Sequence, residues 1–188
     1  SRDLKKKYMT EEGGGDYLSA VLATPPTSRR VIYLHVPFCN KVCSFCPFHR
    51  PDELSRRDYH NYLVAEMHEV RDYPYMKAPI DAVNFGGGTP TSLSPAQMRA
   101  VLSALHENFT IAKGAEISVE TSATELSDEM IEVLQEGGVN RLSVGIQTFD
   151  DATRKLLGRR GSGEFAASRV AAAIRAGITN TGVDLIYN

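Results

Sequence analysis

The stretch Cys39-Asn40-Lys41-Val42-Cys43-Ser44-Phe45-Cys46 holds all three cysteines of this 188-residue chain. Their spacing is C-x3-C-x2-C, and an odd number of thiols placed so close together argues against a disulfide framework. Thiolates that converge from one loop are the ligands that iron and zinc prefer. The stretch therefore predicts a metal centre.

Two kinds of metal centre fit these residues. A structural zinc site usually has four protein ligands, and His35 or His49 could supply the fourth. An iron–sulfur cluster is normally held by four thiolates, so three thiolates would leave one iron open to bind a small molecule. The spacing alone leaves both alternatives open.

Composition narrows the class of protein. The chain has 23 acidic and 21 basic residues, a net charge of −2, and so carries no electrostatic footprint of nucleic-acid binding. No apolar run approaches the length that spans a membrane, and no signal peptide opens the sequence. Free cysteines without a targeting segment are typical of the reducing cytoplasm. We expect a cytoplasmic protein with no transmembrane segment and no nucleic-acid partner.

Short apolar runs alternate with amphipathic segments along most of the chain. A Ser-Pro-Ala-Gln sequence at Ser94 has the spacing of a helix-capping box, and a similar cap is predicted at Ser55. Further helices are predicted over residues 127–136, 150–157 and 164–176. Strands are predicted over residues 31–36, 80–85, 116–120, 140–147 and 179–186.

This alternation predicts an α/β fold of parallel βαβ units with right-handed crossovers. Five strands are too few for a closed eight-stranded barrel, so residues 31–188 are expected to form a partial (β/α) barrel of about five units, truncated at its C-terminus. The fifth strand would then present a raw sheet edge. Residues 1–30 contain Gly13-Gly14-Gly15 and Pro25-Pro26, which predict a loosely structured lead-in.

Polar residues fall at the C-terminal ends of the predicted strands, where α/β barrels place their active sites. The cysteines follow the first strand and Gly86-Gly87-Gly88-Thr89-Pro90 the second, while Glu120, Gln147 and Asp184 lie on the next three. Successive glycines allow a backbone to approach a ligand closely, although they also form plain tight turns. A structural ion-pair network of Glu120, Arg159 and Asp184 is the alternative to a binding rim.

The cysteine spacing, with Phe45 directly before the last cysteine, resembles the cluster loop of the radical S-adenosylmethionine (SAM) superfamily. Two further stretches, Tyr33-Leu34-His35-Val36-Pro37-Phe38-Cys39 and residues 140–150 (NRLSVGIQTFD), resemble its oxygen-independent coproporphyrinogen III oxidase-like branch. The resemblance covers nearly all of residues 31–188. It implies a [4Fe-4S] cluster whose open iron binds SAM, and reductive cleavage of SAM to a 5′-deoxyadenosyl radical. A low-potential electron donor such as flavodoxin or ferredoxin would supply the electron.

The same resemblance implies roles for individual residues. The glycine run, including Gly86 and Gly87, resembles a Gly-Gly-Thr-Pro motif whose backbone meets the amino group of SAM. The implied ligands of the cluster are Cys39, Cys43 and Cys46; the implied contacts of its SAM are Tyr33, Gly88 and Glu120; and the implied contacts of a second SAM are Phe45, Thr89, Gln147, Arg159 and Asp184.

Two positions depart from the relatives that this branch contains. The oxidase has a further cysteine where this chain has Phe48, and the haem chaperones usually have Asp where it has Pro47. The retained second-SAM positions favour a two-SAM methyltransferase acting on a small molecule, either a tetrapyrrole, a quinone or another aromatic compound. The alternatives are a coproporphyrinogen III oxidase (dehydrogenase) activity, a non-catalytic haem chaperone and a zinc-stabilised interaction domain.

Overall fold

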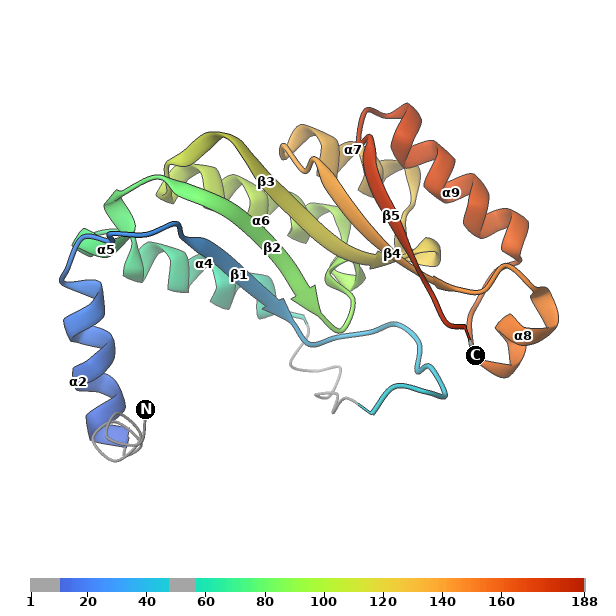
Figure 1. The fold of residues 1–188 in the computed structure, drawn as a ribbon, viewed down its shortest axis with the longest axis horizontal. Coiled ribbons are helices and arrows are strands. Elements are labelled where there is room, and N and C mark those ends of the chain that lie inside the picture. Colours follow the sequence, from blue (N-terminus) through green and yellow to red (C-terminus); the bar gives the residue numbers. More distant parts are fainter. Residues whose placement is uncertain (1–10, 48–56, 188) are drawn as a thin grey trace.

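The computed structural model of the chain describes residues 11–47 and 57–187. These residues contain a five-stranded sheet in the order β1-β2-β3-β4-β5, with every neighbouring pair parallel (Figure 1). Consecutive strands are neighbours, so each connection carries the chain back to the same end of the sheet. The predicted α/β architecture of about five successive units is confirmed. The strands are β1 (Val31–Val36), β2 (Ile80–Gly87), β3 (Ile111–Ser122), β4 (Arg141–Gln147) and β5 (Asn180–Leu185).

β2 and β3 extend beyond the apolar runs that predicted them. Gly86 and Gly87 pair with His35 and Val36, so part of the glycine run belongs to the sheet. The first residue of β3, Ile111, pairs with Ile80, upstream of the predicted start of that strand. A backbone ladder needs no apolar side chain, which is why hydrophobicity alone underestimates the lengths of these strands.

Most helices begin within a residue or two of their predicted positions. Helix α6 (Pro95–Asn108) has the predicted capping box, because Ser94 Oγ accepts from the Gln97 N–H at 3.3 Å and Gln97 Oε1 accepts from the Ser94 N–H at 2.9 Å. The cap predicted at Ser55 lies outside the described residues. The other helical elements are α4 (Tyr59–Val70), α5 (Pro74–Lys77), η1 (Pro90–Ser92), η2 (Ala123–Glu125), α7 (Asp128–Glu136), α8 (Asp151–Leu156) and α9 (Gly163–Arg175).

The lead-in prediction was wrong for part of residues 1–30, because Glu11–Leu22 forms helix α2. The helix runs through the glycine run, whose residues are poor helix formers. Its later residues are mostly helix-compatible, and α2 contacts α5, which supports it at one end of the sheet (Figure 1). Residues 1–10 lie outside the described part of the chain.

The two faces of the sheet differ in character. Helices α4, α6, α7 and α9 lie against one face and leave the other open (Figure 1). Side chains alternate along each strand, so β1 to β4 send mostly apolar residues to the helices and mostly polar residues to the open face. The buried positions are Leu34, Val36, Val83, Phe85, Ile117, Val119, Leu142, Val144 and Ile146. The open-face positions include Tyr33, Asn84, Ser118, Glu120, Ser143 and Asp184.

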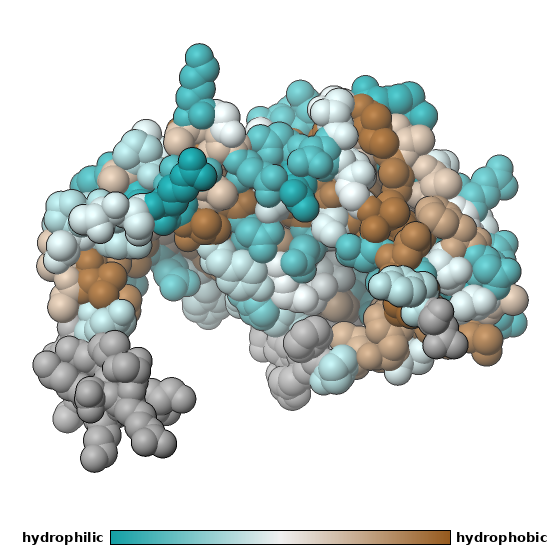
Figure 2. All heavy atoms as spheres, in the orientation of Figure 1, coloured by the Kyte–Doolittle hydropathy of each residue, from teal (hydrophilic) through white to brown (hydrophobic). Residues whose placement is uncertain are grey.

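Strand β5 forms one edge of the sheet and keeps apolar side chains at the surface. Val183, Leu185 and Ile186 are 39%, 50% and 50% exposed. Figure 2 shows a hydrophobic stripe along this strand, beside the largely hydrophilic open face. Among the described residues β5 pairs with β4 alone, as predicted for the fifth strand. No helix in residues 11–47 and 57–187 is long and apolar enough to cross a membrane.

Candidate functional site

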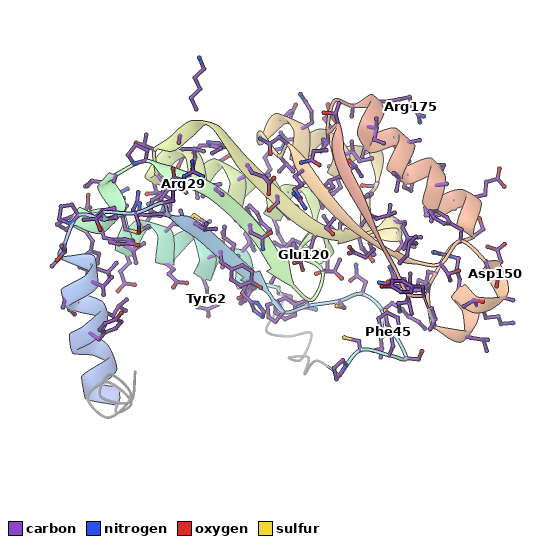
Figure 3. All side chains as sticks on the ribbon, viewed as in Figure 1. Arg29, Phe45, Tyr62, Glu120, Asp150 and Arg175 are labelled. Atoms are coloured by element: carbon purple, nitrogen blue, oxygen red, sulfur yellow. The ribbon has the colours of Figure 1, made fainter. Side chains whose placement is uncertain are left out.

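A cavity of about 420 Å³ lies at the C-terminal ends of the strands, beneath the loop that follows β1. We call residues 37–47 the cysteine loop; in Figure 1 it runs below the strand ends towards α8. Figure 3 shows Phe45 on this loop and Glu120 over the middle of the sheet. Among the sequence-predicted site residues, the cavity is lined by Cys39, Cys43, Phe45, Cys46, Gly87, Gly88, Thr89, Glu120, Gln147, Arg159 and Asp184.

The glycine run holds the near end of the cysteine loop. The Gly88 N–H donates to Val36 O and the Thr89 N–H donates to Phe38 O, both at 2.8 Å. The Thr89 hydroxyl lies 3.4 Å from Cys39 Sγ. A Cβ on Gly88 would lie 2.6 Å from Phe38 O and 3.0 Å from Cys39 Sγ. Glycine is therefore required at position 88 by the close approach of the cysteine loop.

The residues after β4 hold the far end of the loop. The Ser44 N–H donates to Leu157 O at 3.2 Å. Arg159 donates from Nη1 to Cys43 Sγ at 3.2 Å, and its Nη2 donates to Gly145 O. Arg159 thus places a positive charge beside a cysteine sulfur and is anchored to β4 at the same time.

Two carboxylates lie on the open face of the sheet on either side of Ser143. Asp184 accepts a hydrogen bond from Ser143 Oγ, which lies 3.1 Å from each of its carboxylate oxygens. Glu120 is the register partner of Ser143 on the adjacent strand. Both carboxylates are exposed and line the cavity. They can accept hydrogen bonds from hydroxyl or ammonium groups of a ligand.

Tyr33 and Gly86 lie beside this cavity without lining it. A Cβ on Gly86 would lie 2.9 Å from the Tyr33 ring and 3.2 Å from Glu120 Oε1, so all three residues meet on the open face. Burial, with the negative charge of Glu120 as a second cause, raises the pKa of Tyr33. The Tyr33 hydroxyl also lies 3.0 Å from His35 Nδ1. The Nδ1 atom of His35, a candidate zinc ligand, is therefore within hydrogen-bond distance of the Tyr33 hydroxyl.

Gln147 ends β4 in an unusual backbone conformation, with φ +70°. It is the only non-glycine residue with positive φ in the described part of the chain, and such residues are uncommon because Cβ crowds the backbone. Strained backbone of this kind clusters at ligand-binding sites. No sequence pattern indicates this strain, and none indicates that Lys41, Ser143 and Arg154 are among the residues that line the cavity.

The cysteines are free and partly exposed around one cavity, which fits ligands that reach separate irons of a cluster. No three His, Cys, Asp or Glu side chains in residues 11–47 and 57–187 are gathered so that they could hold a single metal ion. Among these residues, the cysteines and His35 are therefore not preassembled as a zinc site. His49 and Phe48, on which other sequence hypotheses depended, lie outside the described residues.

Comparison with known proteins identifies the family. The profile of the Radical SAM superfamily matches residues 33–188. The chain belongs to the radical SAM superfamily. Proteins of this superfamily use a [4Fe-4S] cluster and SAM. The family resemblance seen in the sequence is thereby confirmed.

The relatives place the chain near the coproporphyrinogen oxidase branch. It is 33% identical over 178 residues to the oxygen-independent coproporphyrinogen III oxidase of Bradyrhizobium diazoefficiens, covering 92% of this chain and 39% of that protein. It is 34% identical over 155 residues to the heme chaperone HemW of Lactococcus lactis, covering 82% and 40%.

A solved structure supports the same placement. Coproporphyrinogen III oxidase (HemN) from Escherichia coli, described as a radical SAM enzyme, matches with a TM-score of 0.79 and 32% identity. The match covers 95% of this chain and 41% of that one. The chain thus spans about two fifths of the length of its relatives.

Proposed function

We propose that this chain forms the cofactor-binding core of a radical SAM enzyme. The observation that carries the proposal is the single cavity that gathers the three cysteines with polar side chains from β3, β4 and β5. Cys39, Cys43 and Cys46 would hold a [4Fe-4S] cluster, which, when bound, supplies the electron that breaks a sulfur–carbon bond of SAM.

The charges that line the cavity suit a ligand of mixed charge. Cations are contributed by Lys41, Arg154, Arg159 and Arg160, and anions by Glu120, Glu125 and Asp184. SAM carries a carboxylate, an ammonium group and ribose hydroxyls. A guanidinium binds a carboxylate, whereas carboxylates accept from ammonium and hydroxyl groups.

For the substrate, the relatives favour a tetrapyrrole and an oxidase-type reaction, because coproporphyrinogen III oxidases recur among them. A two-SAM methyltransferase acting on a tetrapyrrole, quinone or other aromatic compound is the second candidate. It is supported by the five positions assigned to a second SAM, which share the cavity wall: Phe45, Thr89, Gln147, Arg159 and Asp184. A non-catalytic haem chaperone is the third, by likeness to the Lactococcus protein.

The proposed chemistry needs a partner that delivers electrons. A low-potential donor such as flavodoxin or ferredoxin fits this need, and the cytoplasm is the compartment in which free thiols and such donors coexist. The cysteine loop, through which the electron would enter, is partly exposed at all three cysteines.

Product analysis separates these candidates. The chain is reconstituted anaerobically with iron and sulfide, reduced with dithionite, and mixed with SAM and coproporphyrinogen III. 5′-Deoxyadenosine with loss of carboxyl groups from the porphyrinogen supports the oxidase reaction, whereas S-adenosylhomocysteine with a methylated product supports methyl transfer. Stoichiometric haem binding without SAM cleavage supports a chaperone and contradicts the enzymatic proposal.

A further inference from the structure

Helix α8 carries a buried arginine, Arg154, that forms part of the cavity wall. Arg154 is 2% exposed, and its side chain lines the cavity wall. In the part of the chain that the structure describes, its side-chain hydrogen bonds all go to backbone carbonyl groups. A buried guanidinium is costly to desolvate unless its donors are satisfied, so these four acceptors explain how the charge is tolerated.

The four carbonyl groups belong to two segments that flank predicted site residues. Nη1 donates to Ile146 O at 3.1 Å and to Thr148 O at 2.8 Å, on either side of Gln147. Nη2 donates to Arg160 O at 2.8 Å and Nε to Gly161 O at 2.9 Å, directly after Arg159. One side chain therefore ties the end of β4 to the loop before α9.

The arginine fork is suited to this task. A guanidinium presents five N–H donors in a rigid plane, whereas a lysine ammonium has three donors on one nitrogen and cannot replace all four of these hydrogen bonds. The backbone conformation at Gln147, with φ +70°, is one that must be held by its surroundings. Burial, followed by the nearby charge of Arg159, lowers the pKa of Arg154.

We propose that Arg154 is a positioning residue that fixes Gln147 and Arg159 on the cavity wall. Through the second segment it keeps the Arg159 guanidinium at Cys43 and Gly145. Within residues 11–47 and 57–187, Arg154 makes no hydrogen bond to any of the three cysteines, so it acts through its neighbours. The identity of the ligand, SAM, rests on the proposed function above, but the effect of Arg154 on the two segments does not.

The test compares two buried arginines. Arg154→Met removes the guanidinium at the site, and Arg30→Met is the matched control, because Arg30 is 4% exposed and donates to the carbonyl groups of Tyr75 and Ala78 away from the cavity. Hydrogen exchange is measured on the apoproteins. The reporters are the amides of residues 157–161 and of Ile186, whose N–H donates to Gln147 O at 2.9 Å.

We expect exchange at these reporters to rise about tenfold more in Arg154→Met than in Arg30→Met, because local opening becomes easier where the ties are lost. SAM affinity of the reconstituted proteins, compared at equal iron content, should fall about tenfold in Arg154→Met and stay unchanged in Arg30→Met. Arg154→Lys should show an intermediate exchange rate and affinity. If Arg154→Met does not fold, Arg154→Lys is judged against the same control.

Equal exchange in the two variants, or unchanged SAM affinity beside a raised exchange rate, would overturn the positioning role. If the unsubstituted chain binds no SAM, the proposed function fails. The exchange comparison then still decides whether Arg154 orders the segments around Gln147 and Arg159.

Discussion

Arg159 and Cys43, which are 116 residues apart in the sequence, are joined by a hydrogen bond of 3.2 Å from the guanidinium to the sulfur. The contact links the cysteine loop after β1 to the segment after β4, and both residues line the cavity. It places a fixed cation beside an implied cluster ligand, where hydrogen bonds to sulfur influence the properties of a metal centre.

Replacing this arginine should weaken ligand binding. In Arg159→Lys the forked contact to Cys43 and Gly145 is lost, and we expect SAM affinity of the reconstituted chain to fall about tenfold. Equilibrium dialysis with SAM measures it. Arg175→Lys, at the exposed end of α9 far from the cavity (Figure 3), is the control and should bind normally. Equal affinity in both variants would contradict a role for Arg159 at the site.

The close approach at Gly88 predicts a second result. Gly88→Ala places a methyl group against Phe38 O and Cys39 Sγ and should push the cysteine loop away from β2. We expect much less iron to be bound after reconstitution, as measured by iron and sulfide analysis. Gly182→Ala is the control, since its Cβ would lie 3.8 Å from its nearest neighbour, Leu142 O. Full iron content in Gly88→Ala would show that the loop is not held as described.

Substitutions at Gln147 measure the backbone strain at that position. Gln147→Ala and Gln147→Gly both remove the side-chain amide, but only glycine, which lacks Cβ, accepts φ +70° without strain. The free energy of unfolding, from urea titration, should therefore be about 1 kcal/mol higher for the glycine variant. Lower or equal stability of Gln147→Gly would mean that position 147 is not strained.

The sequence was most informative where local rules decide the structure. The capping box at Ser94 and the apolar alternation of β4 are local patterns, and the structure confirms both predictions. The rim of Glu120, Gln147 and Asp184 followed from parallel strand ends meeting at one edge. In the part of the chain that the structure describes, the competing ion-pair network is not seen: Arg159 donates to Cys43 and Gly145, while Asp184 accepts from Ser143.

Other features depended on tertiary contacts that no local pattern encodes. Arg154 looks like a surface residue of a short helix, and only the folding of two loops around it makes it a buried donor. Helix α2 forms although it contains a run of three glycines, which have low intrinsic helix propensity. The assigned roles of the cavity residues remain predictions.

The titration of Tyr33 provides a test on the open face of the sheet. Its raised pKa means that the folded state favours the neutral phenol, so Tyr33 contributes stability below about pH 10 that is lost as the pH rises through the folded value. Glu120→Gln removes one cause and should lower this pKa, while burial keeps it above its ordinary value. The tyrosinate absorbance difference between each protein and its Tyr33→Phe variant reports the pKa. An unchanged pKa of Tyr33 in Glu120→Gln would show that the charge of Glu120 does not act on the Tyr33 hydroxyl.

The most direct test of the central claim is the electron paramagnetic resonance spectrum of the anaerobically reconstituted, dithionite-reduced chain, recorded with and without SAM. The account predicts the signal of a [4Fe-4S] cluster that changes when SAM is added, because both bind in the cavity formed by Cys39, Cys43 and Cys46. A chain that binds zinc but assembles no cluster, or a cluster signal that SAM leaves unchanged, would contradict it.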